Sequence, residues 1–230
     1  MKYLRFLLIC VPLSFIGYFM NWNATVMFIL TCISIVPLAG YLGNATESIA
    51  VYTGPKAGGF LNATFGNATE LIISFFSIRA GLFEVVKATL VGSVLGNILL
   101  VLGCSILAGG LKNKVLKYDA KVGRSTATML LFAVAALAIP AVFMSKYSEE
   151  IIVSKYQNFS IITSVIMLCT YVIGVIYSFK GQTDLYDDSE EEEEAEWSLP
   201  ISIAVLAVAT VLIAIESELL VSSIEPMTAS

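Results

Sequence analysis

Polar side chains that carry oxygen atoms follow one face of an otherwise apolar segment. Four of them recur at intervals of three, four and three residues: Asn67, Glu70, Ser74 and Ser77. An α-helix would place all four on the same face, and Gly66 just before them allows the helix to bend and to offer a backbone carbonyl. Such oxygens are hard ligands, which suit Ca²⁺ better than any soft metal. The pattern predicts a calcium site with Glu70, Asn67 and Gly66 as ligands. Ser74 would lie along the ion pathway or behind the ligands.

The depth of Glu70 favours a function over a purely structural role. It lies 13 residues after Ala57, the first residue of its apolar segment, or about 20 Å along a helix. A carboxylate at that depth costs several kcal/mol unless it faces protein or water, is protonated, or holds a cation. The alternative is that these polar groups only join helices by hydrogen bonds. That role needs no ionisable group, so ion binding is favoured.

Two further segments repeat this chemistry. In GSVLGN, residues 92–97, Ser93 and Asn97 are four apart and would share a helix face. Hydrogen bonding between helices explains this pair equally well. The letters GNATE, which end at Glu70, occur first at residues 43–47. Glu47 would then lie near the cytoplasmic end of its helix, as an entrance or supporting acid.

The composition is that of an integral membrane protein. Of the 230 residues, 57% are hydrophobic and 13% are charged, about half the charged share of a soluble domain. Apolar segments of membrane-spanning length predict an all-α transmembrane bundle of about seven spans. They lie at residues 6–20, 24–46, 57–79, 84–108, 126–144, 157–179 and 199–222. The first could instead be a signal peptide, but no cleavage site follows it, which favours a retained helix.

The loop charges predict a cytoplasmic N-terminus under the positive-inside rule. In a seven-span arrangement, nine basic residues lie on one side and three on the other. The nine are Lys2, Arg5, Lys56, Lys112, Lys114, Lys117, Lys121, Arg124 and Lys180, and the three are Arg79, Lys146 and Lys155.

The sequence lacks the residue patterns on which most enzymes depend, which argues against an enzyme. The chain has no histidine, and its four cysteines are scattered through apolar segments without metal-ligand spacing. No nucleophile–base pair, phosphate loop or cofactor fingerprint is present, so we expect neither a cofactor nor a nucleic-acid partner. The polar residues predict calcium as a partner and the apolar segments predict membrane lipid, and a homo-oligomer is left open.

Nine of the 18 acidic residues lie between Asp184 and Glu196. Such a run is typical of a solvated linker. A cation-collecting surface at the mouth of the ion pathway is the alternative, because clustered carboxylates raise the local cation concentration.

These segments carry a family resemblance. GGFLNATFGNATELIISFFSIRAG (58–81), followed by VVKATLVGSVLGNILLVLG (85–103), resembles the first signature repeat of the calcium/proton exchangers, the CAX branch of the calcium/cation antiporter superfamily. VPLAGYLGNATE (36–47) fits the helix before it, and the acidic run fits the segment between the family's two halves. The likeness covers nearly all of the chain and is nearest to the bacterial members, which implies a bacterial plasma membrane.

The resemblance implies two inverted five-helix repeats behind an extra N-terminal helix. Each repeat would give a GNxxE motif to a shared midplane site, where Ca²⁺ exchanges for protons. Asn67, Glu70 and the Gly66 carbonyl would bind the ion, and Ser93 and Asn97 would line its path. The implied parts are the extra helix (1–22), the first sodium/calcium exchanger-type repeat (23–180), the acidic linker (181–198) and the start of the second repeat (199–230).

The sequence departs from the family pattern in one respect. A second signature repeat is absent, so we expect this chain to be a fragment of a Ca²⁺/H⁺ antiporter. The alternatives are a Na⁺/Ca²⁺ exchanger and a non-transporting partner subunit of a complete exchanger. Its copies would all insert the same way, which disfavours a pair of opposed half-exchangers.

Overall fold

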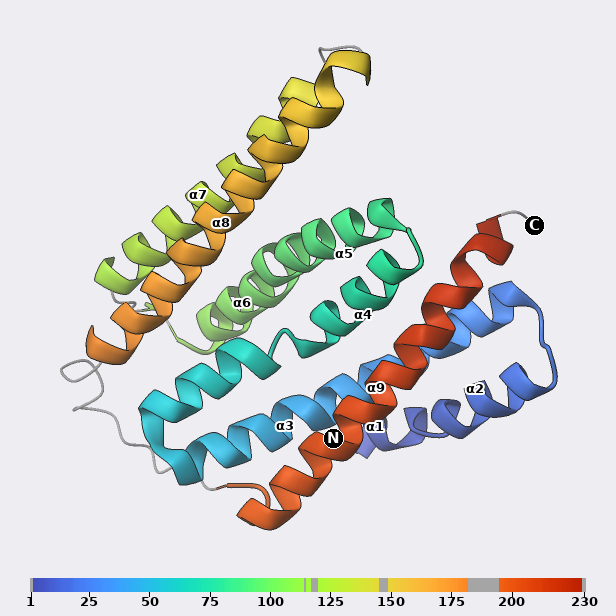
Figure 1. Ribbon diagram of the computed structural model, residues 1–230. Coiled ribbons are helices and arrows are strands. Elements are labelled where there is room, and N and C mark those ends of the chain that lie inside the picture. The colour runs from blue at the N-terminus through green and yellow to red at the C-terminus, as the bar shows by residue number, and fades with distance from the viewer. Residues whose placement is uncertain (1, 114, 117–119, 145–148, 182–194, 229–230) are drawn as a thin grey trace. The chain divides into compact units, whose positions relative to one another are not determined.

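The computed structural model describes residues 2–113, 115–116, 120–144, 149–181 and 195–228. All regular structure in these ranges is helical (Figure 1). The chain forms two compact units, one of residues 1–104 with 189–230 and one of residues 105–188. The predicted all-α class is confirmed.

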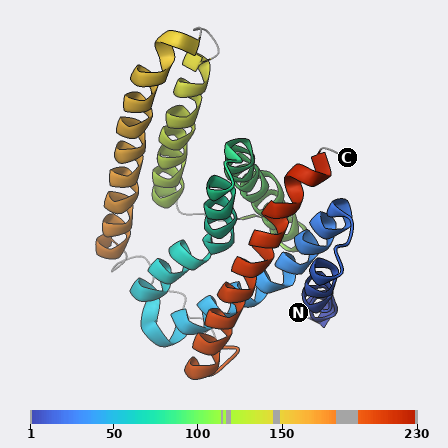
Figure 2. The same cartoon turned by 45° about the vertical axis from the view of Figure 1, so that its right-hand side comes forward.

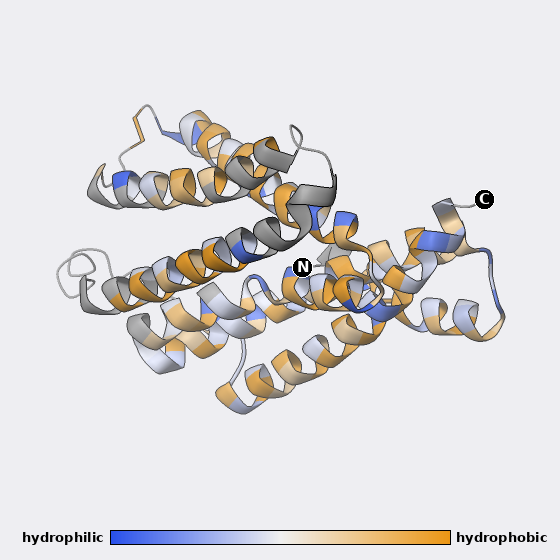
Figure 3. Ribbon diagram, turned by 45° about the horizontal axis from the view of Figure 1, so that its top comes forward, coloured by the Kyte–Doolittle hydropathy of each residue, from blue (hydrophilic) through white to orange (hydrophobic). Residues whose placement is uncertain are grey.

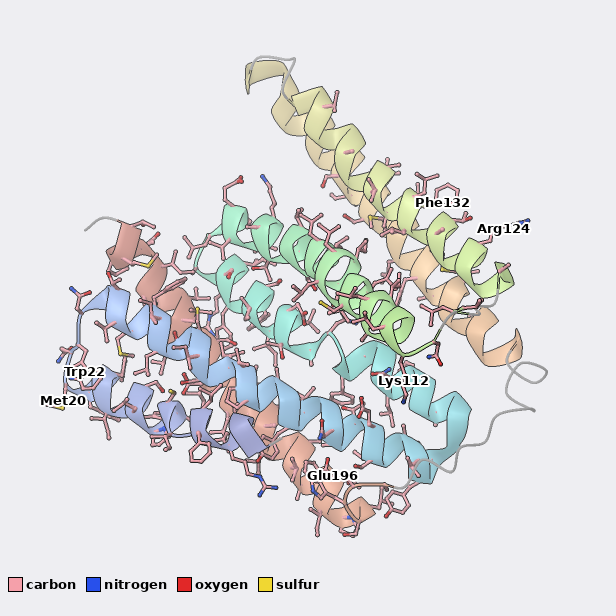
Figure 4. All side chains as sticks on the ribbon, turned by 180° about the vertical axis from the view of Figure 1, so that it is seen from behind. Met20, Trp22, Lys112, Arg124, Phe132 and Glu196 are labelled. Carbon is pink, nitrogen blue, oxygen red and sulfur yellow. The ribbon has the colours of Figure 1, made fainter. Side chains whose placement is uncertain are left out.

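The first unit begins with two short helices and a long one. These are α1 (Lys2–Leu7), α2 (Cys10–Phe19) and α3 (Ala24–Phe65). Figure 4 shows Met20 and Trp22 together at the turn between α2 and α3. The Asn23 side chain caps α3 by accepting a hydrogen bond of 2.8 Å from the Thr25 backbone N–H.

Helix α3 is kinked at Gly54. This glycine has φ 82° and ψ 170°, a combination that residues with a side chain adopt only at considerable cost. Pro55 follows it and disfavours a helical residue before itself. The straight part of α3 therefore runs to Gly54 and not to residue 46, where the sequence predicted its end. Glu47 lies inside the helix as a result.

The next helices carry most of the candidate residues. They are α4 (Ala68–Arg79), α5 (Phe83–Leu95), the π-helix η1 (Gly96–Leu102) and α6 (Gly103–Lys112). The expected span at residues 57–79 is thus divided between the end of α3 and α4. The expected span at 84–108 is one continuous helical stretch with a π-helical middle, which no sequence signal had indicated.

Helix α9 (Leu199–Thr228) packs against α2, α3 and α4 (Figure 1). The buried apolar residues at this junction come from all four helices: Val11, Leu38, Leu42, Ala68, Ala209 and Ile213. Just before α9, Trp197 stacks on Tyr41 of α3 with ring centroids 6.0 Å apart and planes 9° apart. The core of the first unit therefore joins the two ends of the chain.

The second unit contains α7 (Ala120–Met144) and α8 (Glu149–Gly181). These two long helices lie side by side (Figure 2). They contain the expected spans at residues 126–144 and 157–179.

Apolar residues recur along the helices (Figure 3), and many of their large side chains are exposed. Among the described residues, three stretches are long and apolar enough to cross a membrane: Ala24–Gly54, Phe83–Lys112 and Leu199–Thr228. Shorter apolar helices lie at Arg5–Phe19 and Ser160–Gly174. These features are those of an integral membrane protein, in which lipid covers the apolar faces. The count of seven spans stays a prediction.

Candidate functional site

A break between two helices forms the frame of the site. Helix α3 ends at Phe65 and α4 begins at Ala68, and Asn67 between them has the non-helical φ −113° and ψ 12°. The bend thus lies where Gly66 predicts one. The backbone hydrogen bonds around the break run from Gly66 N to Asn62 O (2.9 Å) and from Leu71 N to Asn67 O (3.1 Å). Neither ends on the Gly66 carbonyl oxygen, for which the described part of the chain shows no backbone hydrogen bond across the break.

Helix ends create the electrostatics of the break. Glu70 lies in the first turn of α4, where the positive end of the helix dipole stabilises an anion. The preceding helix ends at Phe65 and presents its last carbonyl oxygens, which attract a cation. The break therefore places the carbonyl end of α3 next to the first turn of α4, which carries Glu70. Membrane transporters use broken helices in this way.

Glu70 is joined to the neighbouring helix α5. Ser93 Oγ donates a hydrogen bond of 3.1 Å to Glu70 Oε1, and both side chains are half-buried. Two residues that the sequence selected from separate segments are thus brought together. The hydrogen bond holds the carboxylate in one orientation.

The other candidates are distributed around this pair. Asn67 is exposed at the break, and Asn97 is exposed on η1. Short π-helical stretches occur frequently at functional sites. Glu47 is exposed on α3, and the structure shows no hydrogen bond between it and Glu70. No group of three or more acidic, cysteine or histidine side chains gathers in the described ranges.

Buried hydroxyl groups continue the polar face of α4. The Ser74 and Ser77 side chains are buried, and among the described residues neither Oγ has a hydrogen-bond partner. Three buried hydroxyls of α3 differ, because Thr31, Ser34 and Thr46 each donate to a carbonyl oxygen one turn earlier. The α4 hydroxyls are therefore available to other groups.

One acid was missed by the sequence analysis. Glu216 of α9 is fully buried, and Ser14 Oγ of α2 lies 2.5 Å from its Oε1. It interrupts the apolar run VLIAIESELL, so the argument used for Glu70, an acid at membrane depth, could have found it. Its partner could not be foreseen, because Ser14 is 202 residues away in sequence.

The acidic run lies mostly outside the described residues, which resume at residue 195. Within the described part, Asn44 Nδ2 donates a hydrogen bond of 2.7 Å to Glu196 Oε2. Glu196 lies where the chain enters α9 (Figure 4). The asparagine of the first GNATE segment therefore anchors the end of the acidic run.

The chain is similar to known proteins over most of its length. The family described as sodium/calcium exchanger protein matches residues 23–180. The Ca(2+)/H(+) antiporter of Synechocystis sp. is 41% identical, with 97% of this chain and 65% of that protein covered. The Ca(2+)/H(+) antiporter ChaA of Bacillus subtilis is 43% identical, with 92% of this chain and 61% of that protein covered.

Two solved structures are also similar to this chain over nearly its whole length. The structure of native YfkE matches with a TM-score of 0.78 and 38% identity, over 99% of this chain and 63% of that chain. A second structure, described as the Ca2+/H+ antiporter protein YfkE, matches with a TM-score of 0.80 and 37% identity. The chain spans less than two thirds of the length of these relatives. By its family match and these identities, the chain belongs to the sodium/calcium exchanger protein family, with calcium/proton antiporters among its relatives.

Proposed function

We propose that this chain supplies the Glu70 half of the ion site of a Ca²⁺/H⁺ antiporter. The observation that carries the proposal is the broken helix at Gly66 and Asn67, with Glu70 in the first turn after the break and Ser93 bonded to it. The names of the relatives support this choice of ions. The antiporter would be a secondary active transporter that exports cytoplasmic calcium.

Competition for Glu70 would couple the two ions. Calcium neutralises the carboxylate by pairing with it, and a proton neutralises it by forming the acid. Either form avoids an uncompensated charge at membrane depth. Because the site cannot hold both ions, the binding of one releases the other.

The described residues provide only part of a calcium shell. Glu70, Asn67 and the Gly66 carbonyl provide fewer oxygens than the six to eight that Ca²⁺ takes. We therefore propose that the other ligands come from a second repeat of the kind that the resemblance implies. The basic loops further support a cytoplasmic N-terminus, and the bacterial relatives support a plasma-membrane location.

A chimaeric antiporter tests the proposal. This chain would replace the matching part of the Bacillus subtilis relative, and pH-gradient-driven Ca²⁺ uptake would be measured in vesicles. We expect uptake to be lost in Glu70→Gln. The matched control is Glu84→Gln on α5, whose exposed carboxylate pairs with Lys87 at 2.6 Å, and it should retain uptake. Uptake that is unchanged in Glu70→Gln would contradict the proposal.

Three further measurements separate the rival functions. Replacing the pH gradient with a Na⁺ gradient would drive uptake only by a Na⁺/Ca²⁺ exchanger. The 230-residue chain alone should also be tested in vesicles. Glu70-dependent uptake by it would show that the chain assembles a complete site without a second repeat. Co-purification with a longer antiporter, together with no change in that antiporter's flux upon Glu70→Gln, would instead favour a partner subunit.

A further inference from the structure

Glu216 is a second acid at membrane depth, apart from the proposed calcium site. It lies 17 residues after Leu199 and 12 before Thr228 in the membrane-spanning helix α9, or about 26 and 18 Å from the two ends. Its side chain has no exposed surface. An isolated carboxylate there would be strongly destabilising.

The number of hydrogen atoms that Ser14 can supply shows whether Glu216 is protonated. Ser14 Oγ lies 2.6 Å from the Val11 carbonyl oxygen and 2.5 Å from Glu216 Oε1. Two oxygens at such distances need a hydrogen between them, and a serine hydroxyl carries one. A carbonyl oxygen carries none. The second hydrogen must therefore come from Glu216.

We infer that Glu216 is a proton-binding site, in which its carboxylic O–H donates to Ser14 Oγ and Ser14 donates to the Val11 carbonyl. This chain of hydrogen bonds satisfies all three oxygens. It also ties α2, which belongs to no repeat in the implied arrangement, to α9. The site takes a proton and no metal, because one acid and one hydroxyl are too few oxygens for Ca²⁺.

The surroundings of Glu216 support the neutral form. Its Oε2 is buried and has no hydrogen-bond partner among the described residues, which a protonated acid tolerates better than a charged carboxylate.

The helices packed against α9 carry the following titratable groups: Cys10 and Tyr18 on α2; Cys32, Tyr41, Glu47, Tyr52 and Lys56 on α3; Glu70 and Arg79 on α4. On α9 itself, Glu218 and Glu225 are exposed. The Lys56 side chain lies outside the described part. None of the others hydrogen bonds to Glu216 or pairs with it, so no described cation compensates a charge there.

The contact with α2 controls the release of this proton. If Glu216 lost its proton, a single hydrogen would remain for the two short contacts of Ser14 Oγ, and a buried negative charge would lie beside them. Release of the proton therefore requires water to reach Glu216, which the contact between α2 and α9 covers. This inference concerns protonation alone and holds whether or not the chain carries calcium.

Infrared spectroscopy of the purified full chain at pH 7 tests the inference. A protonated carboxyl has a C=O stretch that an ionised carboxylate lacks. We expect a carboxylic band that shifts in Ser14→Ala, because the acid loses its acceptor, and that is completely lost in Glu216→Gln. The matched control is Glu218→Gln, two residues along the same helix, which should keep the Ser14-sensitive band. The amide in Glu216→Gln is uncharged and of the same shape, so this variant should fold.

The outcomes are decisive in both directions. A Ser14-sensitive band at pH 7 that disappears in Glu216→Gln alone supports the site. The absence of such a band, or its survival in Glu216→Gln, overturns it. If Ser14→Ala fails to fold by circular dichroism, Ser14→Cys provides the same test, because a thiol is a weaker acceptor and should shift the same band. Failure of calcium transport in the chimaera would not alter these results.

Discussion

Ser93 and Glu70 meet across the interface of α4 and α5, with Ser93 Oγ 3.1 Å from Glu70 Oε1. Each comes from a separate polar segment of the sequence, and each is half-buried. The hydrogen bond holds the carboxylate in one orientation next to the helix break. It thereby links the position of α5 to the geometry of the proposed calcium site.

Removing this hydrogen bond should weaken calcium binding. Ser93→Ala takes away a donor to a charged group, an interaction of about 1.5 kcal/mol or more. We expect the Ca²⁺ concentration for half-maximal uptake by the chimaeric antiporter to rise roughly tenfold. The control is Ser164→Ala on α8, where an exposed hydroxyl donates a hydrogen bond of 2.8 Å to the Ser160 carbonyl oxygen. Equal calcium dependence in both variants would argue against the role of Ser93.

Part of this site could be predicted from the sequence because the membrane restricts the structures that an apolar segment can form. Lipid cannot hydrogen bond to the backbone, so apolar segments of sufficient length must be helices. On a helix, the spacing of Asn67, Glu70 and Ser74 determines a common face, and Gly66 marks the bend. These local rules located the polar face and the break without any knowledge of the fold.

The unpredicted features depend on contacts between distant segments or on backbone detail. The Gly-Pro pair at Gly54 signals a kink, but the apolar pattern had placed the helix end at residue 46. Nothing in the sequence indicated the π-helix at Gly96–Leu102. The pairing of Ser14 with Glu216 arises only when α2 and α9 pack, because no periodicity relates residues so far apart.

The kink in α3 should depend on glycine at position 54. Gly54→Ala forces a side chain into φ 82°, which costs about 1–3 kcal/mol, so the unfolding temperature in detergent should fall. Gly59→Ala is the control, because Gly59 is helical and an added Cβ meets no atom within 4 Å. That variant should be neutral or slightly more stable. Equal unfolding temperatures in the two variants would contradict a strained kink.

The helix break should require glycine at position 66. A Cβ added there would lie 2.5 Å from the Asn62 carbonyl oxygen, so Gly66→Ala must move the backbone that frames the site. We expect the chimaeric antiporter to insert normally but to lose most calcium uptake, since small displacements at a binding site strongly reduce function. Gly110→Ala on α6, where an added Cβ meets no atom within 4 Å, should keep uptake. Normal uptake by Gly66→Ala would show that the geometry of the break is unimportant.

The stacked rings of Tyr41 and Trp197 should stabilise the attachment of α9 to α3. Their centroids are 6.0 Å apart, and such pairs contribute about 0.5–1.5 kcal/mol beyond the burial of area. We expect Trp197→Ala to lower the unfolding temperature, and Tyr41→Phe to leave it nearly unchanged because the ring remains. A double-mutant cycle with Tyr41→Ala isolates the pair. A coupling energy near zero in that cycle would mean that α9 is held by its buried apolar face alone, without help from the residues that lead into it.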